Sequence, residues 1–363
     1  MSFLEHIRDI EDPRIPGVVL YRLDEILLTV LVGLLCRGED FDEIEDICGE
    51  LLGYLRRFLP FAHGIAPAQT LRRTLARSAG IGGGIRPMDR QSGQAHSRCR
   101  GDRWEDRAGF QTRRRRQGRA SSRVGLGAGA GLILAQQAVD GKSNEITAIP
   151  ELLDRIELEG AIVTIDAMGT QKAITAKIIT RKADYVLALK GNQGTLEADA
   201  ALFFADPVLA ADCPCHDETD SGHGRIEERT VRAANAAWLA ERHPEWKGLT
   251  SIVSVTVRRT IKKTGATSTE TRLFISSLPP DPRQIAAAVR AHWSIENNLH
   301  WALDVTFRED ECRVRKDHSA RNLAMIRRVV LNLLRREPSR ISLKRKRLKA
   351  AFNHAFRTEL LAR

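Results

Sequence analysis

The chain has 363 residues, of which 42% are hydrophobic and 28% are charged, so it can bury a sizeable core. Its longest apolar run, 26–36, is interrupted by Thr29 and Gly33 and is shorter than the roughly 20 residues that span a bilayer. The amino terminus carries acidic residues and lacks the pattern of a cleaved secretory signal. These features exclude a peptide-sized module and predict a protein of the cytosol without a membrane helix.

The charge is unevenly distributed along the chain. Lys and Arg number 57 against 46 Asp and Glu, which gives a net charge of +11 and makes nucleic acid the first partner to consider. The stretch 86–123 contains twelve Arg and four acidic residues, so it alone supplies +8. The rest of the chain is only mildly basic.

The six cysteines are scattered without the paired spacing of a zinc finger, and a cytosolic protein keeps them reduced. Cys213, Cys215 and His216 lie close together in sequence and could form a metal cluster, but no second pair follows at a suitable distance. Ordinary loop cysteines are the favoured interpretation.

Helical spacing of apolar residues predicts two helices within 19–58, the second capped by Asp40, and a third helix beginning near Thr70. Residues 1–79 would then form a small helical domain. Such a domain could bury only its own core, or it could contact DNA or mediate dimerisation. The next stretch, 80–131, is rich in Arg and Gly with almost no apolar periodicity, so its composition predicts a poorly ordered basic segment.

Regular patterning returns at Leu132. Apolar runs at 132–135, 161–165 and 185–189 alternate with helix-like stretches at 149–158 and 172–182, which is typical of an α/β fold with a sheet buried on both faces. Further elements follow, namely a half-buried hairpin of 251–261 and 271–278 around Gly265, helical regions at 281–303 and 319–336, and a basic helix at 340–349.

Two carboxylates stand out in this pattern. Asp166 ends a buried strand, and in open α/β sheets ligands gather at the carboxyl ends of strands; the alternative role is a cap for the next helix. Glu296 lies beside the apolar stripe of a late helix and could point at the sheet edge that carries Asp166, or it could be a solvated surface residue. Two carboxylates brought together bind divalent cations, and Mg²⁺ is the expected ion, with Mn²⁺ as a substitute.

Several segments resemble ISAs-type DDE transposases of bacterial insertion sequences. They include VDGKSNEITAIPELLDRIELEGAIVTIDAMGTQ (139–171), HGRIEER (223–229) and AVRAHWSIENNLHWALDVTFREDECRVRK (288–316), and the amino-terminal EDPRIPG resembles the helical domain that precedes their catalytic core. The resemblance implies an RNase H-like core over 132–337 with a β-rich insertion at about 217–280. It also implies a DDE triad in which two Asp and one Glu hold two Mg²⁺ ions.

Residue by residue, the resemblance places Asp166 at the second Asp and Glu296 at the Glu of the triad. It makes double-stranded DNA the partner, meaning the element's own ends and target DNA, with a homo-oligomer as the active form on the bacterial nucleoid. His223, Arg225 and Arg229 would contact DNA or the active site, or form a charged hairpin. At the positions where related families place Tyr, Arg and Lys, this chain has Val289, His292 and Leu303, so no role is carried over.

The first Asp of the triad is missing. The family has it in a strand reading like VIAIDGK, whereas this chain reads RGDRWEDR at 100–107 and GRASSRVGLGAGAG at 118–131. Read one base forward, these codons can encode AIDGKT and GALHLVSAWAREQG. We infer that roughly 80–131 is translated out of frame, and we expect the first core strands to be disrupted and the chain to be inactive. Asp102 or Asp106 could replace the missing first Asp. Both lie in a segment with few apolar residues, however, and such a segment is not typical of a buried strand.

Three functions follow from these observations. The first is a transposase that has lost catalysis, and the second is a non-catalytic DNA-binding remnant that recognises element ends. The third is a Mg²⁺-dependent nuclease on the same fold. In the second case the basic tail 338–363 would bind DNA; the alternative is that it forms a solvated helix. Its candidate DNA contacts are Lys344, Arg345, Lys346, Arg347 and Lys349.

Overall fold

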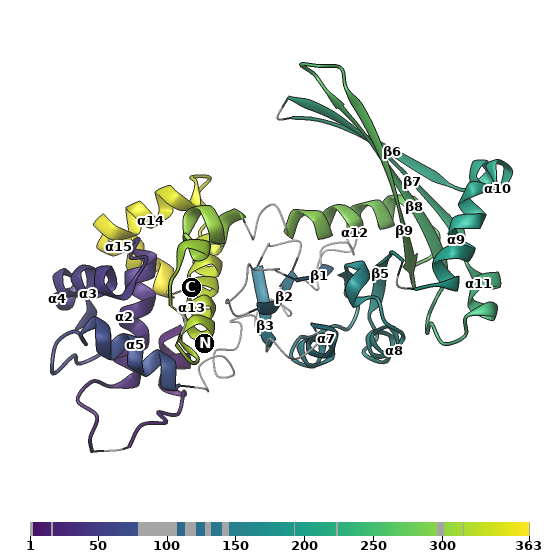
Figure 1. The fold of residues 1–363 in the computed structure, drawn as a ribbon. Coiled ribbons are helices and arrows are strands. Elements are labelled where there is room, and N and C mark those ends of the chain that lie inside the picture. The colour runs from purple at the N-terminus through teal and green to yellow at the C-terminus, as the bar shows by residue number, and fades with distance from the viewer. Residues whose placement is uncertain are drawn as a thin grey trace, which may run out of the picture.

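The computed structural model describes residues 3–15, 17–78, 107–112, 121–127, 132–139, 145–191, 193–222, 224–295, 301–314 and 316–362. Helices from both ends of the chain gather on one side, and a nine-stranded sheet with its covering helices lies on the other (Figure 1). None of the helices within these ranges is both long enough and apolar enough to cross a membrane.

The amino-terminal part is helical, as the sequence predicts. Its helices are α1 (Phe3–Arg8), α2 (Leu23–Leu35), α3 (Phe41–Glu50), α4 (Leu52–Leu55) and α5 (Ala68–Arg77). Every residue of α2 is buried, so this helix is the centre around which the others pack. Asp40 caps α3 as expected, because its carboxylate accepts a hydrogen bond of 2.9 Å from the backbone N–H of Glu43.

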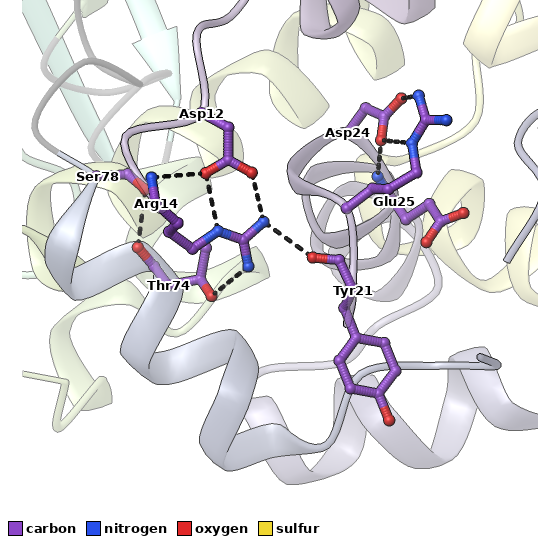
Figure 2. A network of polar contacts seen from close by, with 8 residues as sticks. Asp12, Arg14, Tyr21, Asp24, Glu25, Thr74 and Ser78 are labelled. Atoms are coloured by element: carbon purple, nitrogen blue, oxygen red, sulfur yellow. Dashed lines mark hydrogen bonds and ion pairs between the residues drawn. The ribbon is translucent and has the colours of Figure 1, made fainter. Parts of the chain in front are cut away.

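The segment between α1 and α2 is held by an arginine. Arg14 forms a two-pronged ion pair with Asp12, with Nε–Oδ1 at 2.8 Å and Nη2–Oδ2 at 2.7 Å. It also donates to the Tyr21 carbonyl at 2.9 Å and to the Thr74 hydroxyl of α5 at 3.4 Å (Figure 2). The EDPRIPG motif is thereby fastened to α5.

The carboxyl-terminal helices complete this helical part. They are α13 (Ser319–Arg336), α14 (Leu343–Phe352) and α15 (His354–Ala362). Buried residues of all three belong to the same hydrophobic core as those of α2, α3 and α5. The expected basic tail is therefore not a free appendage, since it packs as α14 and α15 against the amino-terminal helices (Figure 1).

The nine strands form one sheet in the order β3-β2-β1-β4-β5-β9-β8-β7-β6. Strands β1, β4 and β5 are parallel neighbours, and the other pairs are antiparallel. Their bounds are β1 (Arg107–Thr112), β2 (Ser121–Gly127), β3 (Leu132–Val139), β4 (Ile162–Ile165), β5 (Asp184–Leu189), β6 (Cys215–Gly222), β7 (Arg225–Asn235), β8 (Ser251–Ile261) and β9 (Thr267–Ser276). The strands expected at 132–135, 161–165 and 185–189 are confirmed, as is the hairpin around Gly265, whose φ of 69° suits the turn.

One expectation about the sheet is wrong. The first core strands were expected to be disrupted, yet β1 pairs in parallel with β4 and antiparallel with β2, so the central position is filled. Backbone hydrogen bonding does not depend on side-chain identity, which allows an Arg- and Gly-rich segment to occupy a strand position between two partners.

Helices cover both faces of the sheet. One face packs against α7 (Glu145–Asp154), α8 (Lys172–Thr180), α9 (Thr195–Ala205) and α11 (Ala237–Arg242), while the short α10 (Pro207–Asp212) lies beside α9. The opposite face packs against α12 (Pro282–Ile295). Burial on both sides explains why β4 is apolar throughout except for Thr164.

Candidate active site

Asp166 directly follows β4 at the carboxyl end of the parallel strands. Its carboxylate caps the short helix Ala167–Gly169 by accepting a 3.3 Å hydrogen bond from the backbone N–H of Gly169. A side chain at position 169 would meet Ile165 Cγ2 at 2.4 Å and Ile149 Cδ1 at 2.7 Å, so glycine is required for this tight turn. Asp166 therefore caps the following short helix, which is the alternative role considered from the sequence. The same residue also lines a pocket.

The pocket has a volume of about 730 Å³ and passes the ends of β4 and β5 between α9 and α12. Asp166 and Lys190 lie at the strand ends, Glu197 and Phe204 come from α9, and Trp293 comes from α12. Residues of β8 and β9 complete the wall. This is the place where the open-sheet rule expects a ligand.

His292 connects α12 to the strand that carries Asp166. Its Nδ1 lies 3.1 Å from the hydroxyl oxygen of Thr164. Burial lowers the pKa of His292 to about 4, with the nearby Arg272 acting in the same direction and Asp166 opposing it. The ring is therefore neutral at physiological pH, and it positions α12 as a hydrogen-bonding group rather than as a cation.

Trp293 forms the next part of the α12 wall. The guanidinium of Arg272 lies 4.3 Å from the centre of its ring, in cation–π geometry. Arg272 also pairs with Glu270 at 2.8 Å, so the guanidinium that faces the tryptophan is held by a second residue of β9. Sequence reasoning missed His292, Trp293 and Arg272, although the position of His292 four residues before Glu296 was a usable signal.

Glu296, the expected partner of Asp166, lies outside the described residues, as does His223. The described part of α12 ends at Ile295, one residue before Glu296, and its His292 and Trp293 line the pocket with Asp166. The pairing of the two carboxylates therefore stays a prediction.

Arg225 and Arg229 lie on β7, and both pair with Glu227. Arg225 Nε is 3.0 Å from the Glu227 carboxylate, Arg229 binds the other oxygen, and Arg259 of β8 approaches at 3.4 Å. Glu227 is buried and Arg229 is mostly shielded, so this cluster holds β7 to β8. The charged-hairpin alternative accounts for Arg229, and Arg225 remains more than half exposed.

Two of the five expected DNA contacts in the tail are buried. Arg347 donates to the Leu34 carbonyl at 3.1 and 2.8 Å and to the Thr306 carbonyl, and burial lowers its pKa to about 10. Lys346 donates to the carbonyls of Leu334 and Glu337 and pairs with the Glu337 carboxylate at 3.0 Å. The expectation for these two residues is wrong, because helix packing turns them inward.

The other three tail cations, Lys344, Arg345 and Lys349, are exposed on α14. The ammonium of Lys349 lies 4.2 Å from the ring centre of Phe356. A solvated face and a DNA-binding face are both compatible with this exposure.

The cysteine cluster has separate partners. The Cys213 thiol donates to the Leu209 carbonyl at 3.1 Å, and His216 Nε2 lies 3.2 Å from the Glu218 carboxylate. Among the described residues, no group of three or more His, Cys, Asp or Glu is placed to hold a metal ion. Asp166 offers hard oxygen atoms that suit a divalent cation, but it supplies a single carboxylate.

Strand β1 carries no carboxylate. Its sequence is RAGFQT, and its parallel register with β4 ends at the pair Phe110 and Ile165, one residue before Asp166. Asp102 and Asp106 both precede β1 and lie outside the described residues. The central strand is present in the backbone, but it brings no acidic residue to the site.

Comparison with known proteins identifies the family. Residues 82–333 match the family profile described as "Transposase DDE domain", and residues 4–79 match the profile "DDE_Tnp_1-associated". The chain belongs to the DDE transposases. This family generally uses divalent metal ions.

Curated relatives of this DDE transposase cover almost all of it. It is 34% identical to "Putative transposase YncI" of Escherichia coli O157:H7 over 99% of this chain and 94% of that protein. It is 32% identical to "H repeat-associated putative transposase YhhI" of Escherichia coli K12 over 99% and 98%. Among solved structures, the piggyBac transposase synaptic complex with hairpin DNA matches with a TM-score of 0.39 and 11% identity, covering 97% of this chain and 76% of that one.

Proposed function

We propose that this chain is an insertion-sequence transposase that still binds DNA but has lost strand cleavage and transfer. The observation that carries the proposal is the composition of β1. The segment 100–107, where the family has a strand reading like VIAIDGK, reads RGDRWEDR, and β1, which pairs with β4 ahead of Asp166, contains no carboxylate. The loss of one carboxylate removes a negative charge that would offset the charge of a divalent cation.

Asp166 and Glu296 are the residues that would hold the metal. Mg²⁺, or Mn²⁺ in its place, would supply Lewis acidity at the phosphate and lower the pKa of a bound water. The chain's own contribution is positional: Thr164 and His292 hold α12 against β4, and the Gly169 turn sets the direction of Asp166. With one ligand absent, the electrostatic clamp on the phosphate is incomplete.

The missing carboxylate has a genetic explanation in this proposal. Codons of roughly 80–131 are read one base out of frame, and the frame is restored before Leu132. The excess of Arg, Gly and Ala in that segment is what GC-rich coding DNA yields in the wrong frame. The twelve Arg of 86–123 would then be an accident of translation, although a dense positive segment binds phosphate nonspecifically.

DNA binding would be retained through cations elsewhere. The proposed contacts are His223 and Arg225 near the start of β7, with Lys344, Arg345 and Lys349 on α14, while Arg229 contributes mainly through its ion pair. The partner is double-stranded DNA at the ends of the element. We place this protein in the bacterial cytosol on the nucleoid and expect a homo-oligomer when it pairs two ends.

The test uses the purified chain with DNA fragments that contain the genomic flanks of its own gene. We expect salt-sensitive binding without cleavage in Mg²⁺ or Mn²⁺. Strand transfer that is abolished by Asp166→Ala would instead show an intact transposase and refute the loss of catalysis. Cleavage of arbitrary DNA without joining would show the Mg²⁺-dependent nuclease.

A further inference from the structure

Strands β6 to β9 continue beyond the helices that cover the rest of the sheet. Figure 1 shows them rising away from α9 and α12 as a projecting ribbon. We call this projection, residues 217–222, 224–230 and 256–271, the arm. From Ile261 to Thr271 every residue is exposed, so the distal part of the arm presents both of its faces to solvent.

The two faces of the arm differ in chemistry because alternate residues of a strand point to opposite sides. The face turned toward α12 is made of interlocked ion pairs. Glu227 is surrounded by Arg225, Arg229 and Arg259, and Glu270 lies between Arg259 and Arg272. These guanidinium groups pair with carboxylates of the fold, and among them Arg225 is the one whose side chain is more than half exposed.

The opposite face of the arm consists mostly of hydroxyl groups, and we call it the hydroxyl face. Cross-strand pairing aligns Thr256 with Thr271, with their oxygens 3.0 Å apart, and Thr260 with Thr267 at 3.3 Å. The register places eight hydroxyl residues on this face: Thr219, Ser221, Thr230, Thr256, Thr260, Thr267, Thr269 and Thr271.

Two cations stand among these hydroxyls. Arg258 aligns with Glu228 and Thr269, and its nearest carboxylate oxygen is 3.7 Å away, beyond hydrogen-bonding distance. Lys262 reaches across the tip of the arm and donates to the Ser221 hydroxyl at 2.8 Å. Both side chains can therefore contact an anionic ligand while breaking few of their present interactions.

The hydroxyl face leads from the tip of the arm to the pocket beside Asp166. Thr256 and Thr271 belong to both, and they line the pocket together with Ser254 and Arg232 of the same face. A ligand that lies along the arm on this side would therefore reach the pocket that Asp166 lines, where α9 and α10 form the neighbouring wall.

We propose that the hydroxyl face binds the sugar-phosphate backbone of the DNA duplex that enters the site; this inference rests on the proposed function. Phosphate oxygens are contacted in protein–DNA complexes mainly by Arg, Lys and hydroxyl side chains. Hydroxyls spaced about 6.6 Å apart along each strand provide repeated donors without the excess positive charge of a nonspecific patch. The face carries the carboxylates Glu228 and Asp217, and Thr230 occupies the latter with a 2.6 Å hydrogen bond.

The experiment measures the affinity for a fluorescent duplex of arbitrary sequence at several salt concentrations. The double variant Arg258→Ala/Lys262→Ala should bind less tightly, and the slope of log affinity against log salt should fall by about 2. Arg259→Ala is the matched control, because it removes a cation from the next position of β8 on the other face. It should leave the slope unchanged.

A second variant separates binding from folding. Thr260→Val/Thr267→Val keeps the β-branched shape of both side chains and removes their hydroxyls, so melting should change little while affinity falls severalfold. The inference is overturned if both double variants bind like the wild type, or if Arg259→Ala weakens binding equally. A wild-type chain that binds no DNA would instead remove the proposed function itself.

Discussion

The imidazole of His292 lies 3.1 Å from the hydroxyl of Thr164, which joins helix α12 to strand β4 two residues before Asp166. This contact lies between the strand that precedes Asp166 and the helix that precedes Glu296, the two residues expected to hold the metal. It is a contact between uncharged groups, since burial lowers the pKa of His292 to about 4.

Removal of either partner should destabilise the core. We expect Thr164→Val to cost about 1–3 kcal/mol of unfolding free energy, because it removes the hydroxyl that contacts a buried ring nitrogen. The double variant Thr164→Val/His292→Ala should cost less than the sum of the single variants, which urea denaturation can measure. Strict additivity would show that the two groups do not interact.

Gly169 should not tolerate a methyl group. An added Cβ would lie 2.4 Å from Ile165 Cγ2, so Gly169→Ala must displace the turn that Asp166 caps, at a cost of about 1–3 kcal/mol. Gly49→Ala is the control, because nothing lies within 4 Å of its added Cβ and the residue is helical. Thermal melting should show a loss for the first variant and none for the second.

Arg347 and Arg345 of α14 should have different roles, the first in stability and the second in DNA binding. Arg347→Ala removes hydrogen bonds to the Leu34 and Thr306 carbonyls and should cost about 2–4 kcal/mol of stability. Arg345→Ala should leave stability within about 0.5 kcal/mol but weaken DNA binding and lower its salt slope by about 1. If Arg345→Ala leaves DNA affinity and salt slope unchanged, α14 is a solvated face and no DNA contact.

Acid should loosen the contact between α12 and β6. Burial raises the pKa of Glu218, but the ion pair with Arg290 at 2.6 Å and the contact with His216 outweigh it, so the pKa lies below its ordinary value. The folded state then holds fewer protons than the unfolded state, and this stabilisation is present above the unfolded pKa of 4.5 and lost as pH falls through the folded value. Glu218→Gln should therefore flatten the pH dependence of stability in the acid range. An identical profile would contradict the assignment.

Much of the fold was readable from the sequence, because its signals are local. Continuous apolar runs marked β4 and β5, and Asp40 followed by acidic residues marked the start of α3. The hairpin of β8 and β9 followed from strict alternation around Gly265. In each case neighbouring residues in the chain determine the structure.

The errors have a shared physical cause, which is contact between distant segments. Arg347 and Lys346 are indistinguishable in sequence from their exposed neighbours, and only the packing of α14 against α2 and α13 buries them. In the same way, β1 is a strand because β4 and β2 flank it, although its own residues carry no strand pattern. The role of His292 likewise depends on a distant segment, because its ring contacts Thr164 of β4.

We infer that this DDE transposase lacks the first of the three carboxylates that would hold the metal ions. The most direct measurement compares this chain with a version whose codons for 85–131 are shifted forward by one base, each incubated with the flanks of the gene and Mn²⁺. Our account predicts that the shifted gene encodes AIDGKT and that only its product cleaves the DNA, in a manner lost with Asp166→Asn. Equal cleavage by both chains, or a shifted sequence without that Asp, would contradict it.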